Sequence, residues 1–153
     1  MTSEADVAEV LTAAIGGLGP LTRRLYQVHT RLWHEQVDRD LTGPQFTVLS
    51  LLDIHGDMDQ GTLGSLAHLD KSTAAPLLDR LRRRGLVEFA KDDADRRRKL
   101  VALTADGREL AERLAPSVIA ISEQMLAVFT PEERQHFLVL LHRLLEAPQT
   151  EEP

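Results

Sequence analysis

Residues 71–104 constrain the fold more than any other part of this chain, because they carry five structural signals in a fixed order. An apolar stripe at three- and four-residue spacing predicts the buried face of a helix. Gly85 follows where a left-handed C-terminal cap is expected. A strand beginning at Leu86, a charged turn at residues 91–95 and a returning strand at residues 100–103 complete the series. This order predicts a winged helix. The stripe consists of Ala74, Leu77, Leu78 and Leu81, and the first strand also contains Val87 and Phe89.

The segment before this helix predicts a helix-turn-helix. Residues 62–69 form a short helical pattern with leucines at every third position, and a tight turn at Asp70 and Lys71 joins it to the helix that begins near Ser72. The second helix of such a motif can enter the major groove by its N-terminal end. Ser72 or Thr73 is expected to cap that helix and leave backbone N–H groups for a phosphate.

Four consecutive cations follow the charged turn: Arg96, Arg97, Arg98 and Lys99. A hairpin tip with such a block can place guanidinium groups in the minor groove of DNA, where the negative potential is concentrated. The alternative is a solvated hairpin that gains nothing from its charge.

The net charge of −6 argues against nucleic acid as a partner until its distribution is considered. Residues 62–110 contain eleven Lys or Arg against eight Asp or Glu, whereas the rest of the chain contains seven against sixteen. The expected DNA-binding segment is therefore basic and the rest acidic, although an imbalance of this size also fits an ordinary solvated surface.

The rest of the chain is predicted to be helical. Residues 4–15 form a first short helix, ended by two glycines and Pro20, and an apolar stripe carries a second helix from residue 21 to about residue 38. Thr42 and Gln45 have the spacing of a capping box, which begins a helix that ends near Gly56.

Two further helices complete the chain. Thr104 is expected to cap a long helix that Pro116 should bend, and residues 130–133 form a capping box that opens the last helix. Residues 138–141 are four consecutive apolar residues, so this helix needs cover on more than one side. A second subunit is the expected cover, and a position inside the monomer is the alternative. Twofold symmetry would place two recognition helices on a palindromic site.

Two motifs resemble the MarR family of transcriptional regulators. Residues 81–87 and 95–104 (LRRRGLV and DRRRKLVALT) resemble the "rL…GLV" and D-x-R…LT wing signatures of that family, and residues 41–49 (LTGPQFTVL) resemble its second helix. The resemblance implies a mainly α-helical fold with a small β-hairpin wing. It further implies a single domain over residues 1–153, with dimerisation helices in residues 1–40 and 105–153 and the winged helix-turn-helix in residues 41–104.

The implied function is that of a homodimeric repressor that leaves a palindromic operator when a small ligand binds. The candidate DNA contacts fall into two groups. Phosphate contacts are expected at the second helix of the helix-turn-helix, where two small residues could also face bases. In the wing, the resemblance sends Arg97 into the minor groove, and Asp95 could hold it in place. The full set is Lys71, Ser72, Thr73, Ala74, Arg80, Asp95, Arg96, Arg97, Arg98 and Lys99.

Ala75 and Pro76 depart from the family, whose members usually carry polar or basic residues there. Base reading from the middle of the helix is therefore expected to be poor, and Pro76 should lie in the first turn, where its missing N–H costs little.

The resemblance also implies an effector pocket between the dimerisation helices and the winged helix, often for aromatic carboxylates or phenols. Arg24, His29, Trp33 and His34 are the candidates to line it, with Trp33 stacking and Arg24 pairing a carboxylate. The alternative is that Trp33 packs in an interface and the histidines are solvated.

Other classes find little support. The chain has no cysteine, no stretch of about 18 apolar residues and no basic signal sequence, so the cytoplasm is expected. No catalytic motif is present, and no enzyme or cofactor is expected. His34 and Asp38 have the spacing of two metal ligands, but no further cluster accompanies them, so no metal is expected. The alternative function is a winged-helix protein-interaction module without specific DNA binding.

Overall fold

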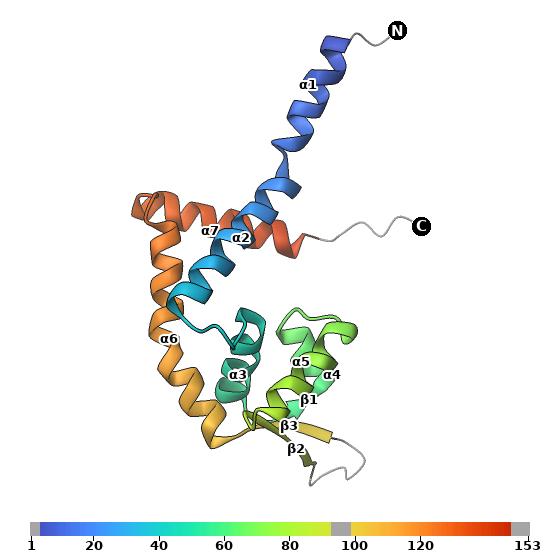
Figure 1. Ribbon diagram of the computed structural model, residues 1–153, viewed down its shortest axis with the longest axis vertical. Helices are drawn as coiled ribbons and strands as arrows, with labels where there is room; N and C mark the ends of the chain where they lie inside the picture. The colour runs from blue at the N-terminus through green and yellow to red at the C-terminus, as the bar shows by residue number, and fades with distance from the viewer. Residues whose placement is uncertain (1–3, 93–98, 148–153) are drawn as a thin grey trace.

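The computed structural model describes residues 4–92 and 99–147, which form a mainly helical chain with one small sheet (Figure 1). The winged helix lies at one end, α6 runs from it along the molecule, and α1 projects from the opposite end. The elements are α1 (Glu4–Ile15), α2 (Leu18–Gln36), α3 (Gly43–His55), β1 (Met58–Asp59), α4 (Gln60–Leu66), α5 (Lys71–Arg83), β2 (Val87–Lys91), β3 (Lys99–Leu103), α6 (Ala105–Leu126) and α7 (Pro131–Glu146).

The sheet has three antiparallel strands in the order β1-β3-β2. The predicted hairpin is present, with Val87 opposite Leu103 and Phe89 opposite Val101. Strand β1 was not predicted. It has only two residues, too few to show an alternating pattern, and it exists because Met58 pairs with Val101.

Several predicted helix ends are confirmed. Thr42 and Thr130 both form reciprocal capping boxes, and the Thr104 hydroxyl accepts from the Gly107 N–H at the start of α6. One boundary was wrong: Pro20 does not follow the first helix as a stop but lies in the first turn of α2. Proline is tolerated there because a first-turn N–H has no partner within the helix.

The end of α5 confirms the predicted glycine cap. Gly85 has a φ of 70°, which favours glycine. The Leu86 N–H donates to the Leu81 carbonyl at 3.0 Å and the Gly85 N–H donates to the Arg82 carbonyl at 2.9 Å, the two bonds of a Schellman motif. This turn sends the chain directly into β2.

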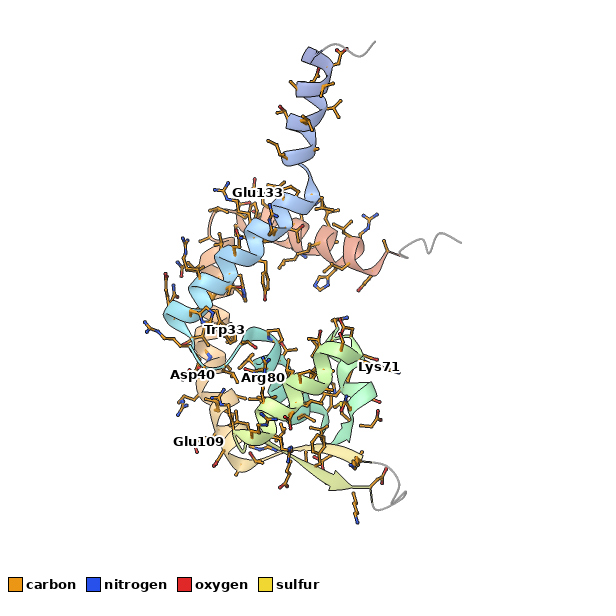
Figure 2. All side chains as sticks on the ribbon, turned by 45° about the vertical axis from the view of Figure 1, so that its right-hand side comes forward. Trp33, Asp40, Lys71, Arg80, Glu109 and Glu133 are labelled. Carbon is orange, nitrogen blue, oxygen red and sulfur yellow. The ribbon has the colours of Figure 1, made fainter. Side chains whose placement is uncertain are left out.

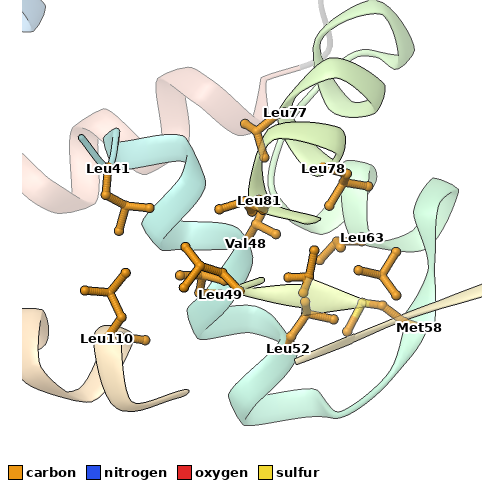
Figure 3. Close-up of a cluster of buried hydrophobic side chains, with 14 of the residues drawn as sticks. Leu41, Val48, Leu49, Leu52, Met58, Leu63, Leu77, Leu78, Leu81 and Leu110 are labelled. Carbon is orange, nitrogen blue, oxygen red and sulfur yellow. The ribbon is translucent and has the colours of Figure 1, made fainter. Parts of the chain in front are cut away.

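The main core lies within the winged helix and under the first half of α6 (Figure 3). Leu41, Leu49, Leu81 and Val101 are completely buried, and they come from the loop before α3, from α3, from α5 and from β3. Gly107 lets α6 approach closely, since a Cβ at this position would lie 2.1 Å from the Leu86 carbonyl oxygen. The helices and strands of the winged helix are therefore held by one shared core.

A smaller cluster joins α2 to α6. Leu32, Trp33 and Ile121 are buried together, with Phe46 packed against them. Among the described residues, the two terminal helices contribute no side chain to either core. No residue of α7 is buried, and every side chain of α1 whose burial is described is exposed.

Within the described part of the chain, no single helix combines the length and hydropathy needed to cross a membrane. Among the described helices, the pair α6 and α7 reaches this length and hydropathy when the two are taken together, and the pair is bent by 104° at its break.

Candidate nucleic-acid interface and adjoining pocket

The turn between α4 and α5 sets the geometry of the helix-turn-helix. The Leu69 N–H donates to the Gly64 carbonyl at 2.8 Å, and His68 takes a positive φ of 53° to make the turn. Gly64 is buried, and a Cβ built on it would lie 3.7 Å from the Ala74 Cβ. This close approach fixes α5 against α4.

Asp70 caps α5, so the prediction of Ser72 or Thr73 as the cap was wrong. The Thr73 N–H donates to Asp70 Oδ1 at 2.8 Å, and the Ser72 hydroxyl donates to the same oxygen at 2.6 Å. These bonds hold the pKa of the Asp70 carboxyl below its usual value, with the Ser72 bond as the largest cause. Asp70, Ser72 and Thr73 are all residue types that cap helices, and Asp70 does so here because its backbone is extended just before the first helical residue.

Four of the residues expected to contact DNA are exposed on α5: Lys71, Ser72, Thr73 and Arg80. Ala74 is not among them, because it is only 4% exposed and packs toward α4. Pro76 lies on the exposed face as the sixth helical residue, beyond the first turn, so its predicted placement was wrong. The proline removes the bond that the Ser72 carbonyl would otherwise accept, and burial of the leucines on the opposite face holds the helix.

Two further arginines near the end of α5 are held by Asp79. Arg82 lies 2.9 Å and Arg83 2.6 Å from its carboxylate oxygens. The hydrogen bond from Arg82 is the largest cause that lowers the pKa of the Asp79 carboxyl. Arg82 also lies over the ring of Phe89, 5.9 Å from its centre. Sequence reasoning missed this cluster, although the three- and four-residue spacings could have indicated it.

The wing is described only at its base. Asp95, Arg96, Arg97 and Arg98 lie outside the described residues. Lys99 is exposed at the start of β3 and lies directly opposite the exposed Lys91. Like charges facing each other across a strand pair are unfavourable unless an anion lies nearby.

A small hollow of about 80 Å³ lies between α2 and the start of α3. His29, Trp33 and His34 line it together, as three of the four predicted pocket residues. Its complete lining is Tyr26, His29, Thr30, Trp33, His34, Thr42, Gly43 and Pro44. Trp33 is 3% exposed, contacts the rings of His29 and Phe46, and donates its indole N–H to the Leu41 carbonyl at 2.5 Å. It is therefore both a wall of the hollow and part of the core.

Arg24 does not lie at this hollow but lines another one with Gln27, Val28 and Arg31. The reason is helical geometry. A separation of nine residues places Arg24 and Trp33 on opposite faces of α2, whereas His29 and Trp33 are one turn apart on the same face.

A larger hollow of about 390 Å³ lies beside the first, between α2, α3 and α5. It shares Tyr26, Thr42 and Pro44 with the smaller hollow and is also lined by Arg80. Its complete lining is Tyr26, Thr42, Pro44, Gln45, Ser72, Thr73, Pro76, Leu77 and Arg80. Sequence analysis assigned Arg80 to DNA alone, yet this residue also supplies a cation at the pocket. Figure 2 labels Trp33 and Arg80 near the junction of α2 with the winged helix.

Metal binding receives no structural support from the residues described, among which no group of three His, Cys, Asp or Glu side chains could hold an ion. The pair His34 and Asp38 has no further ligand beside it in this part of the chain.

Comparisons with known proteins agree with this geometry. Residues 41–99 match the model of the MarR family. The HTH-type transcriptional repressor NicR of Pseudomonas putida is 33% identical over 133 residues, which cover 86% of this chain and 84% of that protein.

Two solved structures have the same fold at similar identity. The regulator PcaV of Streptomyces coelicolor, in complex with its natural ligand, superposes with a TM-score of 0.82 at 34% identity, covering 88% of this chain and 96% of that one. BpsR of Bordetella bronchiseptica, whose DNA binding is regulated by 6-hydroxynicotinic acid, has a TM-score of 0.82 at 32% identity, covering 87% and 96%. The chain belongs to the MarR family of winged helix-turn-helix, DNA-binding transcriptional regulators.

Proposed function

We propose that this protein is a homodimeric cytoplasmic repressor, which binds a palindromic operator and leaves it when a small aromatic acid occupies the hollows between α2, α3 and α5. The observation that carries the proposal is the position of Arg80, which lies on the exposed face of α5 and also lines the larger hollow.

DNA binding by the winged-helix region is supported by the placement of its cations. Lys71, Ser72, Thr73 and Arg80 are all exposed on α5, with Lys71 and Arg80 nine residues apart on opposite flanks of the helix, where they could contact phosphates and bases. The facing lysines at positions 91 and 99 would be stabilised by a phosphate near the base of the wing. We place Arg97 in the minor groove, with Asp95, Arg96 and Arg98 beside it at the wing tip.

Dimerisation is supported by the unburied apolar side chains of the terminal helices. Leu11 of α1 is 60% exposed, and Val139 and Leu145 of α7 are 52% and 71% exposed. Exposed apolar side chains gathered on one element are typical of surfaces that bind another protein. We therefore assign dimerisation to residues 1–40 and 105–153 and DNA binding to residues 41–104.

The chemistry of the two hollows supports an aromatic acid as the effector. Tyr26, His29 and Trp33 offer ring surfaces, and Arg80 offers a guanidinium for a carboxylate. An effector carboxylate and a DNA phosphate would then compete for Arg80. Such a ligand binds the DNA-free state better than the DNA-bound state, which is the requirement for release. BpsR, which responds to an aromatic acid, has the same fold.

The test is fluorescence anisotropy of the purified protein with a duplex from upstream of its own gene, beside a scrambled duplex, over a series of salt concentrations. Preferred binding to the upstream duplex with a steep salt dependence is expected. Addition of 6-hydroxynicotinate as a probe effector should weaken binding to wild type, and Arg80→Gln should reduce this response.

Arg97→Ala should weaken binding to both duplexes and lower the salt slope by about 1, because one phosphate-directed cation is lost. Arg143→Ala is the matched control, since it removes the same charge from α7. Unchanged affinity of Arg97→Ala at moderate salt would refute the role of the wing. Equal, weak and salt-insensitive binding to both duplexes would favour the protein-interaction module instead.

A further inference from the structure

The loop between α2 and α3 carries two adjacent carbonyl groups that accept hydrogen bonds from two different side chains, one in α2 and one at the end of α5. The Asp40 carbonyl accepts a hydrogen bond from Arg84 Nη1 at 2.7 Å, across 44 residues of sequence. The next carbonyl, of Leu41, accepts from the indole N–H of Trp33. Trp33 is a wall of the smaller hollow, and Arg84 is the C-cap residue of α5. In Figure 2, Trp33 and Asp40 lie close together at the junction of α2 and α3.

The backbone and the side chain of Leu41 are both held in place, so Leu41 cannot shift independently when Trp33 or Arg84 moves. Its N–H donates to Asp38 Oδ1 at 2.7 Å, and the Asp40 N–H donates to the same oxygen, also at 2.7 Å. The Leu41 side chain is completely buried in the main core. A displacement of the Leu41 carbonyl must therefore move the Asp38–Leu41 segment as a unit, since close-packed interiors transmit strain.

Arg84 transfers such a displacement to the DNA-binding helix. It follows the last residue of α5, and the first turn of the same helix carries Lys71 and Thr73. Although Pro76 leaves one backbone bond of α5 unmade, the buried residues Ala74, Leu78 and Leu81 hold the helix in the core along its length. A shift at its C-terminal end therefore changes the position of its N-terminal end.

We propose that Arg84 is a positioning residue, which couples the Trp33 wall of the effector hollow to the orientation of α5 through the Asp38–Leu41 loop. The inference rests on the proposed function and adds a route of regulation to the competition for Arg80. An effector that displaces Trp33 moves the loop and so alters the hydrogen bond between the Asp40 carbonyl and Arg84. DNA that reorients α5 alters the same bond and so changes the environment of Trp33. This reciprocity is required of any coupling between two binding sites.

The sequence offers a direct reporter, because Trp33 is the only tryptophan. A ¹⁵N-labelled sample therefore gives a single indole N–H resonance, which reports the bond to Leu41. Arg84→Met removes the bond to Asp40. Arg83→Met is the matched control. It removes the same charge at the adjacent position, but Arg83 contacts Asp79 instead of the loop.

In the DNA-free protein, Arg84→Met should shift the indole resonance and make its solvent exchange about fivefold faster, as expected for loss of one hydrogen bond's restraint on the loop. Arg83→Met should leave both unchanged. Identical exchange rates and chemical shifts in the two variants would overturn the proposal.

The second measurement adds a duplex selected by the wild-type protein from a randomised DNA pool. Binding should shift the indole resonance of wild type and of Arg83→Met, and this shift should be lost or strongly reduced in Arg84→Met although that variant still binds. An equal shift in all three proteins, or none in wild type, would overturn the coupling. Failure to select any duplex would overturn the proposed function, whereas the exchange rates of the free protein would still test the contact between Arg84 and the Trp33 wall.

Discussion

The winged-helix region and the terminal helices differ in how much of their apolar surface is buried within one chain. In residues 41–104, side chains from three helices and the sheet enclose a core in which Leu41, Leu49 and Val101 have no exposed surface. In α7, by contrast, no residue is buried, and Leu145 is 71% exposed. Both regions consist of amphipathic or apolar segments, so hydrophobic content alone does not separate them.

This difference shows which contacts the monomer completes by itself. The winged helix has a finished interior that fixes α5 relative to the wing and to α6. The terminal helices present apolar surface that remains to be covered, and covering it by a second copy would set the spacing between two α5 helices. In the proposed dimer, the stability of the DNA-binding surface and the spacing of the two surfaces would depend on different parts of one chain.

The largest effect is expected from a truncation in the core of the winged helix. Leu81→Ala should reduce the free energy of unfolding by about 2–5 kcal/mol, because Leu81 is completely buried and the cavity left behind cannot fully collapse. Urea denaturation would measure the change. Leu145→Ala is the matched control in α7, and an equal loss of monomer stability in both variants would remove the distinction between the two regions.

An intermediate effect is expected from charges on the terminal helices. The double variant Leu11→Glu with Leu144→Glu should weaken dimerisation by about 100-fold, because each carboxylate would be buried at the interface without a partner. Sedimentation equilibrium would measure the dissociation constant. Ile54→Glu is the control, since Ile54 is 73% exposed but lies on α3. A wild-type protein that is monomeric at micromolar concentration would contradict the assignment.

The smallest effect concerns the cap of α5. The pKa of Asp70 is lowered in the folded state, so its carboxylate contributes stability above the unfolded value of about 4, and this contribution is lost as the pH falls through the folded pKa. Asp70→Asn keeps a side-chain cap but does not titrate. Wild type should therefore lose stability relative to the variant between pH 6 and pH 2.5, as followed by denaturation at each pH. Parallel pH profiles would show that the cap contributes no pH dependence.

Features that depend on local interactions were predictable from the sequence. The capping boxes at Thr42 and Thr130, the cap at Thr104 and the left-handed turn at Gly85 each involve residues within a few positions of one another. The two hairpin strands were also evident, because apolar residues from Leu86 to Phe89 and from Leu100 to Leu103 flank a charged segment. Lys91, which was expected in the turn, is instead the last residue of β2 and pairs with Lys99. The resemblance to the MarR family was visible from these ordered motifs.

Other features depend on choices that local sequence leaves open. Asp70, Ser72 and Thr73 are all good caps, and backbone conformation selected Asp70. Arg24 and Trp33 were both predicted to line one pocket, because a guanidinium can pair with a carboxylate and an indole can stack on a ring. Their spacing places them on opposite faces of α2 instead. That separation could have been recognised from helical periodicity alone.

The sequence by itself determined the order of the helices and of the two hairpin strands, the helix ends at Thr42, Gly85, Thr104 and Thr130, and the family, since these follow from side-chain periodicity and from hydrogen bonds between near neighbours. Only the tertiary structure decided that β1 pairs with β3, that Arg80 lines the hollow beside Tyr26, and that Arg84 binds the Asp40 carbonyl. These contacts join residues far apart in the chain. Their partners are selected by how the helices pack around the shared core, and no local pattern encodes that packing.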